Sequence, residues 1–319
     1  MLDARIAEWL LDADPALRWQ VERDLLGAPE DIWQATRARV TTEGFGAELL
    51  RHQDADGQWA GGPFFPAGWE WGSGEPQPWT ATTWALKDLR EWGMPASALT
   101  GTAEKLSATR WEYDDLPYWG GEVDCCINSW TLSNGLWLGA DVDAIADWFL
   151  EHQLGDGGWN CEWVEGSQVS SFHSTLNALI ALLDFQCSTG DTERIRAARR
   201  AGEEYLLTRA LSRRRSTGEP FNEWVYSLAH PRRAYYSVLA AADYFRAACI
   251  ADGIQPDPRM AEAIENIRSQ RQADGTWVQG HRLQGEVWFH VDVPAGEPSK
   301  WVTFQATRVL GWWDSATKE

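Results

Sequence analysis

The sequence predicts an all-α fold, an α/α toroid of about five to six helical hairpins with inner and outer helix rings. Three observations predict it. An amphipathic helix that ends in an acidic glycine turn recurs along the chain, a more apolar helix follows each turn, and no run of alternating residues indicates a β-sheet. Such hairpins cannot bury their apolar faces alone, so we expect them to stack, and a ring is the natural closure.

The recurring segment has one design: a helix that ends in Gln, then an acidic glycine turn, then Trp. The three copies are LLRHQDADGQW (Leu49–Trp59), FLEHQLGDGGW (Phe149–Trp159) and IRSQRQADGTW (Ile267–Trp277). Gln precedes Trp by six residues in the first two copies, whereas Gln270 precedes Trp277 by seven. Glycine just after the last periodic residue predicts that each helix stops there.

A second, more apolar helix is expected after each Gly/Pro/Trp-rich loop, and these helices would form the inner ring. We predict them at Trp79–Glu91, Asp124–Leu138, Phe172–Phe185, Ala234–Ala248 and Ser299–Trp313. Pro78, Pro231 and Pro298 stand just before three of them, where proline is tolerated.

Length and composition predict a single domain over residues 1–319, with helices in 1–40 packing on a repeat region at 41–319. The formal net charge of -19 disfavours nucleic acid as a partner, because the surface repels phosphates. No apolar stretch is long enough to span a membrane and no signal layout is evident. Five cysteines, an odd number, make a poor disulfide framework, so we expect a cytoplasmic protein.

The three Gln-to-Trp segments resemble the QW repeats of squalene–hopene cyclases and related triterpene cyclases. The resemblance covers the chain from about Phe45 to the C-terminus. It implies the α/α toroid that these cyclases share with protein prenyltransferase β-subunits. It also implies an aromatic-lined central cavity, with polar residues at the starts of the inner helices pointing into its mouth.

One cluster of residues resembles the zinc site of protein farnesyl- and geranylgeranyltransferase β-subunits. In that family an Asp-x-Cys begins one inner helix and a His begins the next. Here Asp124 and Cys126 have this spacing, and His173 opens the following inner helix. The resemblance implies zinc as a cofactor, held by Asp124, Cys126 and His173 with the fourth position open, and Cys161 is the candidate for a fourth ligand that would close the site. The basic residues that hold the prenyl diphosphate in that family have no counterpart, since no Lys or Arg lies between Arg110 and Asp124. The alternative interpretation is that these cysteines are simply packed in the core.

The resemblance to cyclases implies a different use of the same place. Those enzymes begin a cationic cyclisation with a protonated aspartic acid at an inner-helix start. Asp124 is the candidate acid, tuned by Glu122 and His173, and Glu75 is the candidate one hairpin earlier. Aromatic faces would stabilise the cations. The candidate substrate-binding residues are Trp71, Trp79, Trp111, Trp119 and Trp159.

The function predicted from these residues is acid-initiated cyclisation or isomerisation of a small isoprenoid substrate. A zinc-dependent, prenyltransferase-like enzyme that uses Asp124, Cys126 and His173 is the first alternative. Acidic, Trp-rich α/α barrels also include glycosidases with paired carboxylates, and a non-catalytic binder of an apolar ligand would need the cavity alone.

Overall fold

Helices make up the regular structure of the chain. The computed structural model describes residues 2–70, 72–190 and 193–317, and within these ranges it contains α-helices and short 3-10 helices but no β-strand, only isolated β-bridges. The predicted all-α class is therefore confirmed. None of the described helices is long and apolar enough to cross a membrane.

The chain divides into two compact units. The first comprises residues 1–122, 130–146 and 283–291, and the second comprises 123–129, 147–282 and 292–319. The helices of the first unit are α1 (Ala4–Leu11), α2 (Pro15–Asp24), α3 (Glu30–Ala38), α4 (Gly44–Leu50), α5 (Thr82–Glu91) and α6 (Thr102–Leu106). The helices of the second unit are α9 (Phe172–Thr189), α10 (Glu193–Leu207), α11 (Val238–Asp252), α12 (Ala261–Ser269) and α13 (Lys300–Ala316). Two helices, α7 (Cys125–Leu138) and α8 (Asp143–Glu151), have residues in both units.

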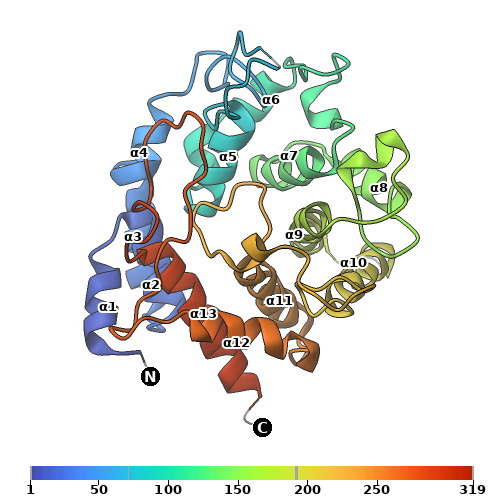
Figure 1. Cartoon of the computed structure of the whole chain (residues 1–319). Coiled ribbons are helices and arrows are strands. Elements are labelled where there is room, and N and C mark those ends of the chain that lie inside the picture. Colours follow the sequence, from blue (N-terminus) through green and yellow to red (C-terminus); the bar gives the residue numbers. More distant parts are fainter. Residues whose placement is uncertain (1, 71, 191–192, 318–319) are drawn as a thin grey trace. The chain divides into compact units, whose positions relative to one another are not determined.

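The first unit is built around α2, which packs against α1, α3 and α4 (Figure 1). Its core is rich in tryptophan. Trp84 is fully buried, and its ring lies 4.8 Å from that of Trp79 and 4.7 Å from that of Trp130. Large indole rings thus supply much of the apolar surface that this unit buries.

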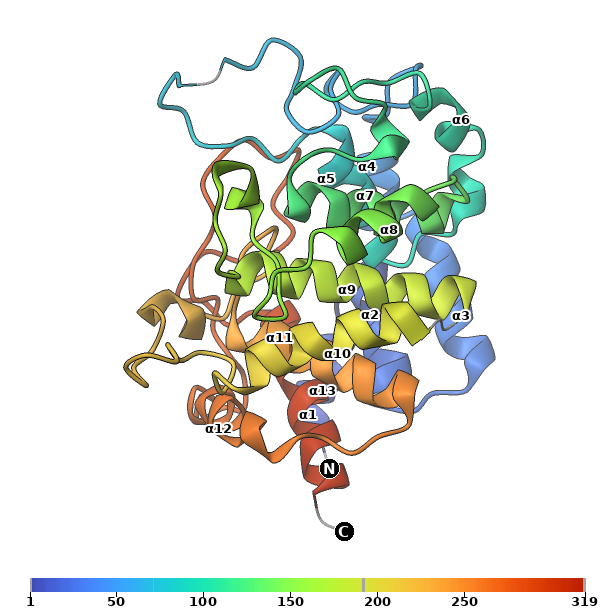
Figure 2. The same cartoon turned by 90° about the vertical axis from the view of Figure 1, so that its right-hand side faces the viewer.

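The second unit has α9 and α11 at its centre. Helix α9 packs against α10 and α11, and α11 packs against α12 and α13; Figure 2 shows α9 and α10 side by side. The first two turns of α9 include three buried polar residues, Ser174, Thr175 and Asn177, on a helix that is otherwise strongly apolar.

The three recurring segments make the same contacts. Each Trp is buried and donates its indole N–H to the carbonyl ten residues earlier, at 2.8 Å in the first and third copies and 2.9 Å in the second. Each Trp backbone N–H also binds a threonine hydroxyl on the next apolar helix. The threonines are Thr82 in α5, Thr175 in α9 and Thr303 in α13. The Trp therefore fastens the end of one helix to the start of the next.

The third segment carries arginine where the first two carry glutamine. Gln53 and Gln153 donate their side-chain amides to the carbonyls of Gly57 and Gly157, two residues before the Trp. In the third segment Arg271 donates Nε to the carbonyl of Gly275 at 3.3 Å. Gln270 instead contacts the carbonyl of Tyr226 and residue Asn266. Arg271 replaces the glutamine structurally, which explains the seven-residue spacing from Gln270 to Trp277.

All five predicted apolar helices are present, and each begins or ends at a residue other than predicted. The first begins at Thr82, three residues after Trp79, and the fourth begins at Val238, because the Ser237 hydroxyl accepts the Ala240 N–H and caps it there. The third and fifth extend to Thr189 and Ala316, and the second begins at Cys125, one residue after the predicted Asp124, which caps it. Helices α1, α2 and α3 lie between residues 4 and 38.

Candidate metal site

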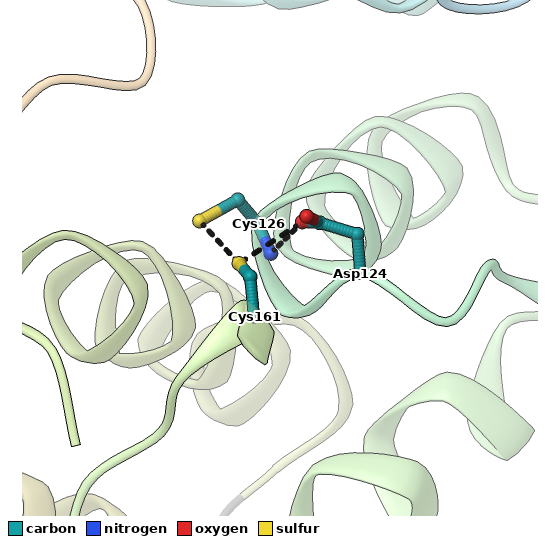
Figure 3. A group of neighbouring side chains, drawn as sticks. All are labelled: Asp124, Cys126 and Cys161. Atoms are coloured by element: carbon teal, nitrogen blue, oxygen red, sulfur yellow. Dashed lines mark hydrogen bonds between the residues drawn. The ribbon is translucent and has the colours of Figure 1, made fainter. Parts of the chain in front are cut away.

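Three of the four predicted metal ligands come together in the second unit. One ligand atom from each of Asp124, Cys126 and Cys161 lies within 4.8 Å of the others, and each side chain is half-buried. The Cys161 Sγ lies 3.2 Å from Asp124 Oδ1 and 3.2 Å from Cys126 Sγ. Figure 3 shows the three side chains pointing toward one another, two from the start of α7 and one from the facing segment. Within the described ranges this is the one such group of His, Cys, Asp or Glu residues.

The start of α7 fixes the first two ligands. The Asp124 carboxylate accepts the backbone N–H groups of Cys126 at 2.7 Å and Ile127 at 3.0 Å, which is the usual bonding of a helix N-cap. These bonds hold Oδ1 at the helix end. Cys126, two residues on, then presents its thiol beside the capped carboxylate.

A short 3-10 helix, Cys161–Glu165, supplies the third ligand. Its N-cap residue Asn160 accepts the N–H of Glu162, and its amide also binds the carbonyl of Val169. Trp163 donates its indole N–H to the carbonyl of Val123 at 2.8 Å, directly before the α7 cap. This bond holds the Cys161 segment against the start of α7.

Ser174 in α9 lies next to both sulfurs of the cluster. Its hydroxyl lies 3.2 Å from Cys161 Sγ and 3.7 Å from Cys126 Sγ, and it accepts the Cys161 backbone N–H. The neighbouring Cys125 is fully buried, and its Sγ lies 3.6 Å from the Ser174 carbonyl oxygen. All five cysteines lie in the described part of the chain, and all are free thiols.

The protonation of the cluster follows from burial and proximity. Burial raises the pKa of Asp124 well above its usual value, and the nearby Cys161 sulfur raises it further. Hydrogen bonds from the thiols of Cys125 and Cys126 lower the pKa of Cys161. The hydrogen bond between Cys126 and Cys161, together with burial, raises the pKa of Cys126. The cluster therefore concentrates its negative charge on Cys161, with protonated neighbours as donors.

The donor set suits zinc. Two thiolates and a carboxylate are common zinc ligands, and ideal tetrahedral distances would separate these atoms by about 3.6 to 3.8 Å. The observed 3.2 Å separations require only a small outward movement of the side chains. Three protein ligands leave one position for water or substrate, which is typical of catalytic rather than structural zinc sites.

His173, the fourth predicted ligand, is not part of the group. Its imidazole contacts the ring of Trp224, with 4.7 Å between centroids, and lies 5.9 Å from the ring of Tyr235. Burial and the charge of Arg232 lower the pKa of His173 to about 4, so the ring is neutral at pH 7. His173 is close enough to the cluster for the charge of Cys161 to affect its pKa. Its ring nevertheless packs against the aromatic rings of Trp224 and Tyr235.

The predicted acids Glu75 and Glu122 belong to the first unit. Glu75 is exposed on a loop and Glu122 is buried. Neither is among the grouped ligands. Asp124 is therefore the predicted acid that the structure places in a cluster.

Four of the five predicted aromatic residues are buried, and each of the four bonds to another segment of the backbone. Trp79, Trp111, Trp119 and Trp159 each donate the indole N–H to a backbone carbonyl. Trp71 lies outside the described residues. Substrate contact by these rings stays a prediction, and each of the four described rings already has a structural role.

Two residues of the site are absent from the sequence prediction. Ser174 borders both sulfurs, and Asn177, one turn later on α9, donates its amide to Cys126 Sγ at 3.4 Å. Their signal in the sequence is polar residues three apart on an apolar helix, which share one face.

No protein-family model and no curated protein matches this chain. A crystal structure described as that of a protein from Actinoplanes is similar to it over 97% of this chain and 98% of that chain. The sequence identity is 15% and the TM-score is 0.47. The function is therefore argued from the site itself.

Proposed function

We propose that this chain is a zinc-dependent enzyme whose metal is held by Asp124, Cys126 and Cys161. The observation that carries the proposal is the convergence of these three ligand atoms within 4.8 Å, from two segments 35 residues apart, at a half-buried position. A half-buried cluster leaves a path for the ion and for a substrate. The α/α toroid suggested by the repeats is part of the same proposal.

A bound zinc ion would act as a Lewis acid and lower the pKa of a water or thiol at its open position. The chain's own residues would hold the ligands in place and transfer the proton. The α7 cap holds Asp124, and Ser174 positions the Cys161 segment through its hydroxyl. His173, neutral and next to the cluster, is the candidate general base or acid.

The substrate class in this proposal is a small, mainly apolar molecule such as an isoprenoid. Three aromatic residues, Trp224, Tyr235 and Tyr236, surround the imidazole of His173. Such a wall favours apolar or cationic groups.

A second candidate function uses the same residue without metal. In acid-initiated cyclisation or isomerisation, Asp124 would donate the first proton. The observation that favours it is the burial of this carboxyl beside the Cys161 sulfur, which raises its pKa and so favours the protonated form.

Elemental analysis of the purified, unlabelled protein tests the proposal. We expect about one zinc per chain, lost in Cys126→Ala and in Cys161→Ala. The matched control is Cys187→Ala, which removes an exposed thiol on α9 and should keep the metal. Absence of zinc from the folded wild-type protein, even after incubation with excess metal, would overturn the proposal and leave the acid mechanism of Asp124.

A further inference from the structure

Asn177 connects the Cys126 sulfur to a loop of the second unit. This side chain is 1% exposed, on α9, and its amide nitrogen lies 3.4 Å from Cys126 Sγ and 3.2 Å from the carbonyl of Ala234. Its amide oxygen accepts a hydrogen bond from Arg232 Nη1 at 3.0 Å. Arg232 in turn donates to the carbonyl of Tyr235.

These partners determine which way the amide faces. A guanidinium group can only donate, so the atom next to Arg232 must be the amide oxygen. The amide nitrogen therefore faces the sulfur and the Ala234 carbonyl, and it has a proton for each.

Asn134 in α7 shows which part of this arrangement is structural. It is fully buried, accepts a hydrogen bond from Arg90 Nε at 3.2 Å and donates to the carbonyl of Thr83 at 3.3 Å. Asn177 has the same two kinds of partner, an arginine and a carbonyl. The contact that sets Asn177 apart from Asn134 is the one with a thiol sulfur.

We propose that Asn177 is a positioning residue of the metal site, whose N–H donates to the Cys126 sulfur and sets both its direction and its strength as a ligand. The inference rests on the proposed zinc function. A hydrogen bond to a ligating sulfur withdraws electron density from it and fixes its orientation, and changes to such partners typically alter metal affinity by about 10- to 100-fold.

Cobalt substitution makes the effect visible, because a thiolate ligand gives Co²⁺ a sulfur-to-metal charge-transfer band in the near ultraviolet. We would titrate wild-type, Asn177→Leu and Asn134→Leu proteins with Co²⁺, and measure Zn²⁺ affinity by competition with a coloured chelator. Asn177→Leu should move the band to longer wavelength, because the sulfur becomes more electron-rich, and should weaken Zn²⁺ binding about tenfold. Asn134→Leu should change neither quantity.

A second variant covers the case in which Asn177→Leu does not fold. Asn177→Asp keeps the side-chain size and the acceptor for Arg232, but it has no N–H for the sulfur and adds a negative charge beside it, so it should move the band at least as far to longer wavelength. A band and a Zn²⁺ affinity unchanged in the folded Asn177 variants would overturn the inference while leaving the metal site intact. A wild-type protein that binds no Co²⁺ would instead overturn the proposed function.

Discussion

At the scale of single residues, the site depends on which way consecutive side chains point at the start of α9. Successive residues of a helix point about 100° apart. Ser174 faces the two sulfurs, so His173 beside it faces Trp224. The sequence predicts that both belong near an inner-helix start, but the rotation of the helix decides which one meets the cluster.

We predict that His173→Ala retains the metal. Its imidazole packs against the ring of Trp224 at a tilted angle and is not grouped with the three ligand atoms, so the zinc content should stay at about one per chain. Elemental analysis beside Cys126→Ala provides the comparison. A loss of zinc equal to that of Cys126→Ala would show that His173 turns inward and completes the site.

Metal binding should release about two protons at pH 7. The pKa values of Asp124 and Cys126 are raised, so both groups hold their protons in the metal-free cluster, whereas zinc requires their deprotonated forms. Apparent affinity should therefore rise with pH. Calorimetry in buffers of different ionisation enthalpy measures the number of protons, and a value near zero would contradict this account of the cluster.

At the scale of elements, the repeated Trp joins the end of one helix to the start of the next. Trp159 is buried, and its indole N–H binds the Phe149 carbonyl while its backbone N–H binds Thr175. We expect Trp159→Phe to lower the free energy of unfolding by about 1–3 kcal/mol, because it leaves a buried carbonyl without its donor. Denaturant titration measures it. The control is Trp312→Phe on the half-exposed C-terminal part of α13, and equal losses in the two variants would contradict the role of the bond.

The sequence predicts the elements better than it predicts the contacts between them. Apolar periodicity and glycine turns locate the recurring helices, because both depend on neighbours in the chain. The exact start of α11 depends on the capping hydrogen bond of Ser237, and a single serine is a weak signal in the sequence. The pairing of Cys161 with Asp124 and Cys126 follows from the resemblance to zinc sites. The sequence shows that Ser174 and Asn177 share one face of α9, but that this face meets the sulfurs depends on the helix rotation that packing imposes.

At the scale of the whole molecule, a network of buried charges contributes to the stability of the second unit. The second unit buries Arg199 completely, and this side chain contacts Glu203 and Asp252, while Gln186 and Tyr244 complete the network. Its location joins α9, α10 and the end of α11. Arg200 also pairs with both acids, so two cations balance two carboxylates that would otherwise repel in a protein with net charge -19.

We predict that Arg199→Ala destabilises the protein by about 3 kcal/mol, because it removes the fully buried cation between Glu203 and Asp252 and leaves these acids only the half-exposed Arg200 as counter-ion. The matched control is Arg259→Ala, which removes exposed ion pairs to Glu204 and Asp257 and should cost at most about 1 kcal/mol. Chemical denaturation of both variants checks the difference. Similar losses would show that the buried network contributes no more than a surface pair.

The most direct test of the central claim is X-ray absorption at the zinc edge of the zinc-loaded protein. With Asp124, Cys126 and Cys161 as ligands, the spectrum should show two sulfur scatterers at about 2.3 Å and oxygen or nitrogen scatterers at about 2.0–2.2 Å. Cys161→Ala should reduce the sulfur shell to one. A first shell without sulfur, or one of four sulfurs, would contradict the account.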